Sequence, residues 1–201
     1  IESEALFLEG DLLRRSSPKK AEARLYEAMW RAIEQGNTDL EARSATMLAY
    51  VVGSVGRRFD EGHRLVEHAR AAATRSGDLR LRGRAEGMAG NLERVRQRWD
   101  RALEHVDRAL LLYQQDSGER TLEYAEVLAT KALVIEELGE GEKAIQLIDE
   151  AIAVLENILG PDHPRVGSQL NIRAVLLRQL GRLDESLVDA TRAVDILDAA
   201  V

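Results

Sequence analysis

A set of small residues recurs through the chain at intervals of 40 to 42 residues, and it constrains the fold more than any other feature. The first small residue of each copy is Ala21, Gly62, Ala102, Ala144 or Ser186. An alanine follows seven positions later, at Ala28, Ala69, Ala109, Ala151 and Ala193. Because positions spaced by three, four and seven share one face of a helix, the repeat predicts a helix in each copy that approaches its neighbour closely.

The composition favours helices over strands. The 201 residues include only three prolines and 4% aromatics, with abundant unbranched side chains that lose little rotamer freedom in a helix. There is no cysteine, which excludes disulfides, thiolate zinc sites and thiol nucleophiles. The sequence therefore predicts an all-α protein.

Turn and capping signals divide the chain into five helix-turn-helix repeats, with ten antiparallel helices in a single array. The predicted repeats cover about residues 1–37, 38–77, 78–117, 118–160 and 161–201. Thr38 to Glu41 reads as a capping box, and the prolines on either side of His163 separate two helices. Since the chain starts at Ile1 and the last helix runs to Val201, we expect a fragment of a longer protein.

These repeats resemble the tetratricopeptide repeat family. The family's small residue in the first helix is matched by Gly10, Ala49, Gly90, Ala132 and Ala174. Its turn glycine is matched by Gly56, Gly139 and Gly181, and its aromatic residue by Phe59 and Trp99. The long period, and the Leu159 to Asn171 connector, look like the form found in kinesin light chains and in many bacterial regulators.

A second resemblance concerns the second repeat. Residues 49–53, together with 58–62, are similar to the repeat regions that follow the catalytic domain of some bacterial serine/threonine protein kinases. The family resemblance implies a right-handed α-solenoid whose first helices line a concave surface. Such arrays dock peptides or partner domains and carry no chemistry of their own, so we expect no enzymatic activity in this segment.

Polar residues on the expected first helices are candidate partner-binding residues. In the third repeat, Arg84, Asn91 and Arg94 share a helical face and are predicted to hold an acidic peptide or a chain terminus. The alternative is that the arginines are solvated or paired with Glu86 and Glu93. The other candidates are Arg43, Tyr50, Glu126, Thr130, Asn171 and Arg178.

Two of these candidates have equally good structural interpretations. Tyr50 could anchor a peptide side chain, or it could belong to the core between helices. Asn171 matches a residue of the family's connector motif and could reach the backbone of a ligand. Capping or hydrogen bonding between repeats would explain Asn171 as well.

Several classes of ligand are excluded. The four histidines lack metal-ligand spacing, no phosphate loop is present, and no acids form a catalytic constellation, so we predict no metal, cofactor or catalytic residue. A net charge of −7 makes the chain a poor general binder of nucleic acid. No apolar run approaches the ~20 residues that span a membrane, and we expect a cytoplasmic location.

The sequence thus predicts a docking scaffold that is the regulatory part of a larger bacterial signalling protein. The alternative is a self-association module, a homo-oligomer that uses an unfinished face of its last repeat and has no separate ligand.

Overall fold

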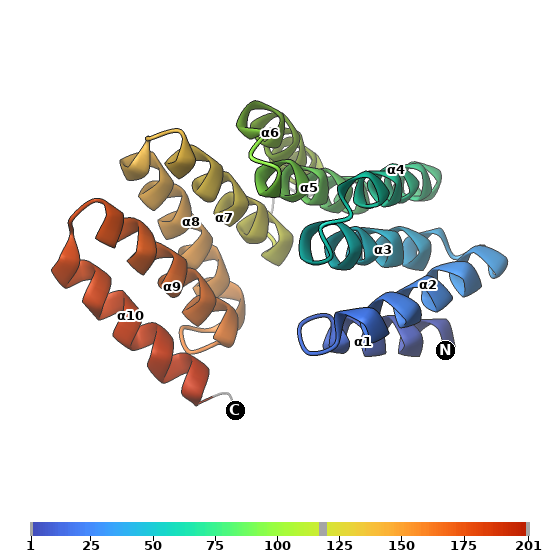
Figure 1. Ribbon diagram of the computed structural model, residues 1–201, viewed down its shortest axis with the longest axis horizontal. Coiled ribbons are helices and arrows are strands. Elements are labelled where there is room, and N and C mark those ends of the chain that lie inside the picture. The colour runs from blue at the N-terminus through green and yellow to red at the C-terminus, as the bar shows by residue number, and fades with distance from the viewer. Residues whose placement is uncertain (1, 117–119, 200–201) are drawn as a thin grey trace. The chain divides into compact units, whose positions relative to one another are not determined.

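The computed structural model describes residues 2–116 and 120–199, which are almost entirely helical (Figure 1). The N-terminal helices are α1 (Glu2–Leu13), α2 (Pro18–Glu34), α3 (Thr38–Leu48), α4 (Phe59–Ser76), α5 (Leu79–Val95) and α6 (Trp99–Asp116), with a π-helix η1 (Ala49–Val55) after α3. The C-terminal helices are α7 (Leu122–Glu137), α8 (Gly141–Leu159), α9 (Pro164–Gln179) and α10 (Leu183–Asp198). No strand occurs in these described ranges, and the predicted all-α class is confirmed.

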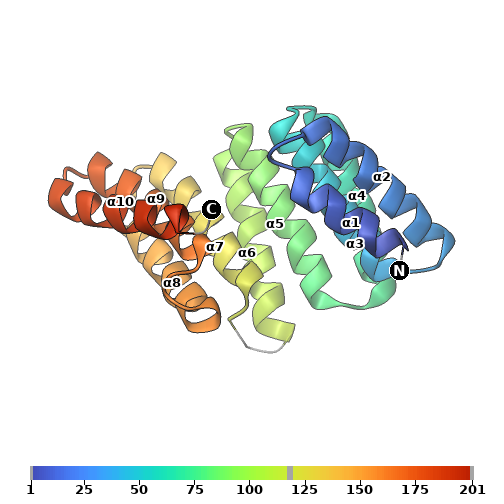
Figure 2. The ribbon, with the colours of Figure 1, turned by 90° about the horizontal axis from the view of Figure 1, so that it is seen from below.

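The chain divides into two compact units, residues 1–117 and 118–201. In the N-terminal unit, α1 packs with α2, α3 and η1 with α4, and α5 with α6, while α2–α3 and α4–α5 contacts join the pairs. In the C-terminal unit, α7 packs with α8 and α9 with α10, and α8 contacts α9. The antiparallel run of helices within each unit can be followed in Figure 2. A single array over residues 1–201 stays a prediction.

The predicted close packing of small residues is present within the helix pairs. A Cβ atom on Gly10 of α1 would lie 2.6 Å from Cγ of Leu25 on α2. In the third pair, a Cβ atom on Gly90 would lie 2.6 Å from Cγ1 of Val106 on α6. Each glycine thus leaves room for a branched side chain that is fully buried on the second helix. This arrangement lets the two helices approach closely.

The first helix of the second pair differs from the expectation. The turn glycine assigned at Gly56 predicts one α-helix up to about Val55, whereas the α-helix ends at Leu48 and η1 continues the chain. The Gly56 N–H donates to the Val51 carbonyl at 2.9 Å, a bond that spans five residues, as in a π-helix. Gly53 of η1 lies against Gly62 of α4, where a Cβ on Gly62 would be 2.8 Å from the Gly53 Cα.

The turn after η1 corrects a second prediction. We assigned the turn glycine to Gly56, but Gly56 has φ −76° and caps η1. Arg57 instead takes the left-handed conformation, with φ 55°. The equivalent residues of the fourth and fifth repeats are Gly139 and Gly181, with φ 83° and 77°. Side chains with a Cβ rarely adopt this conformation, so the sequence pattern favoured the glycine one residue earlier.

The capping box predicted at Thr38 is also wrong. The cap is Asn37, whose Oδ1 accepts a hydrogen bond from the Leu40 N–H at 3.0 Å. The Glu41 carboxylate does not cap the first backbone N–H groups of α3. It is buried and pairs with His68 and Arg75 of α4 instead. Tertiary ion pairs have replaced the local hydrogen bond that the sequence suggested.

The break between α8 and α9 follows the prediction. Helix α8 ends at Leu159 and α9 begins at Pro164, whose ring is tolerated in the first turn. His163 caps α9 by accepting a hydrogen bond at Nδ1 from the Arg165 N–H, at 3.1 Å. In the last pair, the Ser186 hydroxyl donates to the Ala174 carbonyl at 2.7 Å, which links α10 to α9.

Candidate functional site

The predicted docking residues all lie on the first helix of a pair. A row of three polar side chains, which we call the Asn91 row (Ser54, Asn91 and Arg94), joins η1 to α5. Asn91 Nδ2 donates to Ser54 Oγ at 2.9 Å, and Arg94 Nη2 donates to Asn91 Oδ1 at 3.1 Å. Tyr50, half-buried on η1, packs against the core of the unit, and Arg84 lies two turns before Asn91 on α5.

Arg43 is occupied by contacts within its own unit. Its Nη2 donates to Glu4 Oε1 at 2.9 Å, and its guanidinium lies 4.5 Å from the centroid of the Phe7 ring. Both partners belong to α1. Arg43 therefore links α3 to α1, and its guanidinium would have to exchange these contacts to bind a ligand.

In the C-terminal unit, the candidates lie on α7 and α9. Glu126 is exposed and pairs with Arg165 at 3.3 Å, while the Thr130 hydroxyl donates to the Glu126 carbonyl at 3.0 Å. Asn171 and Arg178 are exposed on α9, seven residues apart. Neither of these two side chains has a polar partner among residues 2–116 and 120–199, so both are accessible to a ligand.

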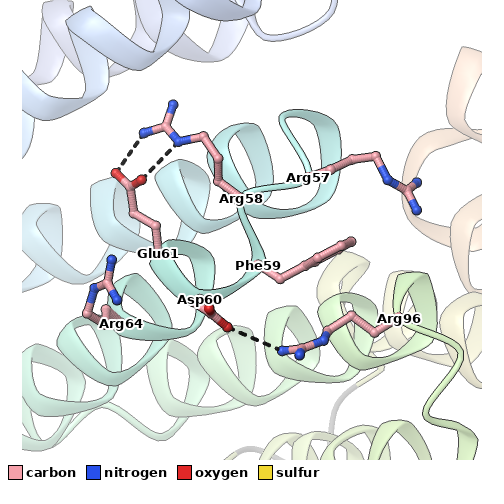
Figure 3. A pocket seen from close by; sticks show the side chains of 7 residues that line it. All are labelled: Arg57, Arg58, Phe59, Asp60, Glu61, Arg64 and Arg96. Carbon is pink, nitrogen blue, oxygen red and sulfur yellow. Dashed lines mark hydrogen bonds and ion pairs between the residues drawn. The ribbon is translucent and has the colours of Figure 1, made fainter.

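A second site, which no sequence pattern pointed to, lies at the start of α4. We call it the Arg57 pocket; it has a volume of about 430 Å³, and its lining residues are Arg57, Arg58, Phe59, Asp60, Glu61, Arg64 and Arg96. Figure 3 shows the Phe59 ring between the side chains of Arg57 and Arg96. Their guanidinium carbons lie 5.4 and 5.5 Å from its centroid, within cation–π range.

The guanidinium groups of this pocket are paired unequally. Arg58 is saturated, since it donates to Glu61 of α4 and to Glu22 of α2 at 2.7 to 3.0 Å. Arg96 reaches the exposed Asp60 only at 3.8 Å. Among the described residues, Arg57 and Arg64 form no ion pair or hydrogen bond with a carboxylate. The pocket therefore presents two guanidinium groups that a ligand could engage.

The contacts among Tyr26, Arg58 and Glu61 shift two pKa values. Hydrogen bonds from Arg58 and from Tyr26 hold the pKa of Glu61 below its usual value. Burial, together with the hydrogen bond to Glu61, raises the pKa of Tyr26 to about 12. Glu61 is thus charged and Tyr26 neutral at pH 7, and Arg58 is committed to the contact between α2 and α4.

Buried glutamates pair with histidines elsewhere in the N-terminal unit. Glu86 of α5 lies 2.9 Å from His105, and Glu93 lies 2.9 Å from His63. Burial raises the pKa of Glu86, but hydrogen bonds from His105 and Arg70 outweigh it and leave the pKa lowered. Burial lowers the pKa of His63 despite the nearby Glu93. These pairs join neighbouring helices, and His63 lies close enough to Arg96 of the Arg57 pocket for that charge to lower its pKa further.

The described ranges contain neither a cluster of metal ligands nor a helix that could span a membrane. No group of three or more His, Asp or Glu side chains there could hold a metal ion. None of the described helices has the length and apolarity needed to cross a membrane.

The last helix leaves an apolar face uncovered. This α10 stripe consists of Leu183, Leu187, Val194 and Leu197, which are 63%, 68%, 55% and 37% exposed. Three of the positions 42 residues earlier, on α8, hold Ile145, Ile152 and Leu155, which are 6%, 5% and 1% exposed. Helix α8 packs against α9 of the following pair. The α10 stripe therefore occupies the repeat positions that, on α8, are buried in a helix that packs against the next pair.

Known proteins with this architecture identify the repeat. The tetratricopeptide repeat family model matches residues 123–199. The C-terminal unit is a tetratricopeptide repeat array. The predicted resemblance is confirmed for this segment, and the matched family is not an enzyme family. No curated protein matches the sequence.

Solved structures extend the tetratricopeptide repeat fold over the whole chain. The crystal structure of BtubC (BKLC) from P. vanneervenii matches with a TM-score of 0.71 and 20% identity, over 98% of this chain and 80% of that one. The TPR-like repeats of a putative kinesin light chain from Podosopora anserina match with a TM-score of 0.62 and 13% identity. The match covers 98% of this chain and 95% of that one. These matches confirm the predicted solenoid fold class.

A third structure is a Rap protein complexed with Competence and Sporulation Factor. It matches with a TM-score of 0.79 and 14% identity, over 97% of this chain and 54% of that chain. At this identity the likeness concerns the fold alone. The predicted link to bacterial protein kinases finds no support in these matches and stays a prediction.

Proposed function

We propose that the protein is a protein-interaction scaffold whose N-terminal unit docks a partner segment across η1 and α5. The Asn91 row carries this proposal. Its side chains link two first helices beside the half-buried Tyr50, at a π-helix, an element found frequently at functional sites. A partner segment that crosses this row would meet an amide, a hydroxyl and a guanidinium, the groups that bind peptide carbonyls and carboxylates.

The fold supports this function. Repeat solenoids present extended surfaces made of successive first helices, and they use them for binding. The Rap protein of similar fold was solved with Competence and Sporulation Factor, so this fold is able to hold a partner. On this basis we propose that the chain is the regulatory part of a larger bacterial signalling protein. In the C-terminal unit, Asn171 and Arg178 are proposed as partner contacts of that unit by itself.

The proposal predicts that reversing the charges of Arg84 and Arg94 weakens binding. Peptides selected by the purified protein from a displayed random library should be enriched in Asp and Glu. Their affinity, measured by fluorescence polarisation, should fall more than about tenfold in Arg84→Glu/Arg94→Glu, because each introduced glutamate would repel a carboxylate of the peptide. The exposed Arg82 of α5 provides the control, and Arg82→Glu should bind nearly as the wild type does. Unchanged affinity in the double variant would exclude this surface.

The α10 stripe favours a second candidate function, self-association. The occupant that fits it best is a second copy, which would pack its α1 against α10. Helix α1 exposes Leu8 and Leu12, at 52% and 81%, one turn apart. The N-terminal unit has 20 basic and 19 acidic residues, a net charge of +1, whereas the C-terminal unit has 8 and 16, a net charge of −8. Contact between the N-terminal unit of one copy and the C-terminal unit of another is thus electrostatically more favourable than contact between two α10 helices.

This second function predicts association that depends on the α10 stripe. Light scattering during gel filtration should give an apparent mass that rises with concentration, and Leu187→Glu should reduce it to that of a monomer, because a carboxylate would be buried in the contact. Leu111 of α6 is 53% exposed, so Leu111→Glu is the matched control and should leave association unchanged. A wild-type protein that is monomeric at all concentrations would rule out self-association.

A further inference from the structure

We propose that the Arg57 pocket binds the carboxylates of an acidic protein segment, with Arg57 and Arg64 as the charged contacts and Phe59 as an apolar wall. This inference rests on the proposed scaffold function, since it assumes a protein partner. It adds a site at the η1–α4 turn that shares no residue with the Asn91 row, and it defines the chemistry of the partner at that site.

The charge balance of the pocket favours an anion. Its lining contains four arginines and two acidic residues, and Glu61 is already bound to Arg58. Arg57 and Arg64 form no ion pair within 4 Å among the described residues, and both are exposed. The charge of Arg64 acts on Glu61 only as a minor cause of the lowered pKa of that carboxyl. The side chain of Asp60 is 87% exposed at 3.8 Å from Arg96, so this weak pair can open at little cost.

The Phe59 ring adds a second argument. Arg57 and Arg96 both lie about 5.5 Å from its centroid, on a single ring, so two like charges are held near each other. A carboxylate bound beside them would reduce this repulsion. The ring itself provides an apolar surface for a side chain next to the acidic one. Charge and aromatic surface together are characteristic of sites that bind peptides.

The backbone at Arg57 points to a role for its side chain. The left-handed turn is occupied by glycine in both repeats of the C-terminal unit, at Gly139 and Gly181. At Arg57 the same turn, with φ 55°, is adopted by a residue that favours it poorly. Gln97 has φ 59° at the corresponding turn of the third repeat but is not part of the pocket, which makes it a useful control.

The pocket suits a protein segment better than a nucleic acid. Nucleic-acid binding depends on many phosphate contacts made by Lys and Arg, whereas this chain has a net charge of −7. The exposed carboxylate of Asp60 would also repel a continuous phosphate backbone. A volume of about 430 Å³ holds a few side chains of a peptide, for instance one or two acidic residues with an apolar neighbour.

Peptide binding by matched variants tests the inference. The probe is a fluorescein-labelled decapeptide of six glutamates and four leucines, with a control peptide in which glutamine replaces each glutamate. We expect the acidic peptide to bind the wild-type protein with an affinity that falls as salt is raised. Arg57→Gly/Arg64→Gln should weaken binding by about tenfold or more, which corresponds to the loss of two charged contacts.

Two controls separate the pocket from general effects. Arg82→Gln removes an exposed arginine about 21 Å from Arg96 along α5 and should bind the acidic peptide within about twofold of the wild type. Gln97→Gly removes the backbone strain at the equivalent turn of the third repeat and should also leave binding unchanged. Both glycine substitutions should raise the melting temperature, by about 2 °C, so that weaker binding by the pocket variant does not reflect unfolding.

The outcomes distinguish this inference from the scaffold function. The inference is overturned if the pocket variant binds the acidic peptide as well as the wild type does, or if Arg82→Gln loses as much affinity. If binding is lost only in Arg84→Glu/Arg94→Glu, the scaffold function stands and the pocket inference fails. Equal binding of the glutamine control peptide also overturns it, since carboxylates would then be unnecessary.

Discussion

Replacing Gly62 with valine is expected to destabilise the N-terminal unit by about 3 kcal/mol. A Cβ on Gly62 would lie 2.8 Å from the Cα of Gly53 and 3.3 Å from Cδ1 of Leu92. The first of these neighbours is backbone, so the clash can be relieved only if η1 and α4 move apart. Such a movement would open the core around the fully buried Leu92.

Urea unfolding followed by tryptophan fluorescence would measure this effect selectively. The two tryptophans of the chain, Trp30 and Trp99, both belong to the N-terminal unit. Gly141→Ala is the control, and it is followed by circular dichroism because the C-terminal unit contains no tryptophan. The Cβ there would lie nearest to the Leu180 side chain, which can rotate away. We expect that variant to lower the free energy of unfolding by less than about 1 kcal/mol. A similarly small cost for Gly62→Val would contradict the close backbone contact described above.

Replacing Arg173 with methionine is expected to destabilise the C-terminal unit by about 3 kcal/mol. Arg173 donates from Nε and Nη2 to the two oxygens of Asp189, at 2.6 and 2.7 Å, and joins α9 to α10. Asp189 is only 5% exposed. Without Arg173, its charge would remain buried without compensation, which costs more than the ion pair itself contributes.

Circular dichroism during urea unfolding would report this loss, because the C-terminal unit contains no tryptophan. The double variant Arg173→Met/Asp189→Leu should recover most of the stability, since it removes both charges. Asp149, the other partner of Arg173, is half-exposed, so Asp149→Ala should cost less than about 1 kcal/mol. A double variant as unstable as Arg173→Met would show that packing, rather than the buried charge, dominates.

The repeat register could be predicted because it depends on residues that are close in sequence. Ala102 and Ala109 each lie about one turn from Val106 on the same helix, and all three are fully buried, as their spacing indicated. The break at Pro164 was predictable for the same reason, since proline acts on the backbone next to it. Local spacing therefore located the helices and the faces that they bury.

The candidate site was predicted only in part. Asn91 and Arg94 share a helical face in the sequence, and the structure brings them into a hydrogen bond with each other. The sequence did not reveal their partner Ser54, because that contact crosses from α5 to η1, 37 residues away. Arg43 was placed on a docking surface, whereas the structure shows it occupied by Glu4 and Phe7 of α1.

By itself, the sequence determined an all-α chain of paired helices with small residues where the helices meet, because helix periodicity is a local property. The tertiary structure alone decided the Arg57 pocket. Its Phe59 ring lies between arginines 39 residues apart in the sequence, and the turn that aims Arg57 follows a π-helix whose Gly53 lies against Gly62. Contacts between helices set these positions, and no spacing along one helix encodes them.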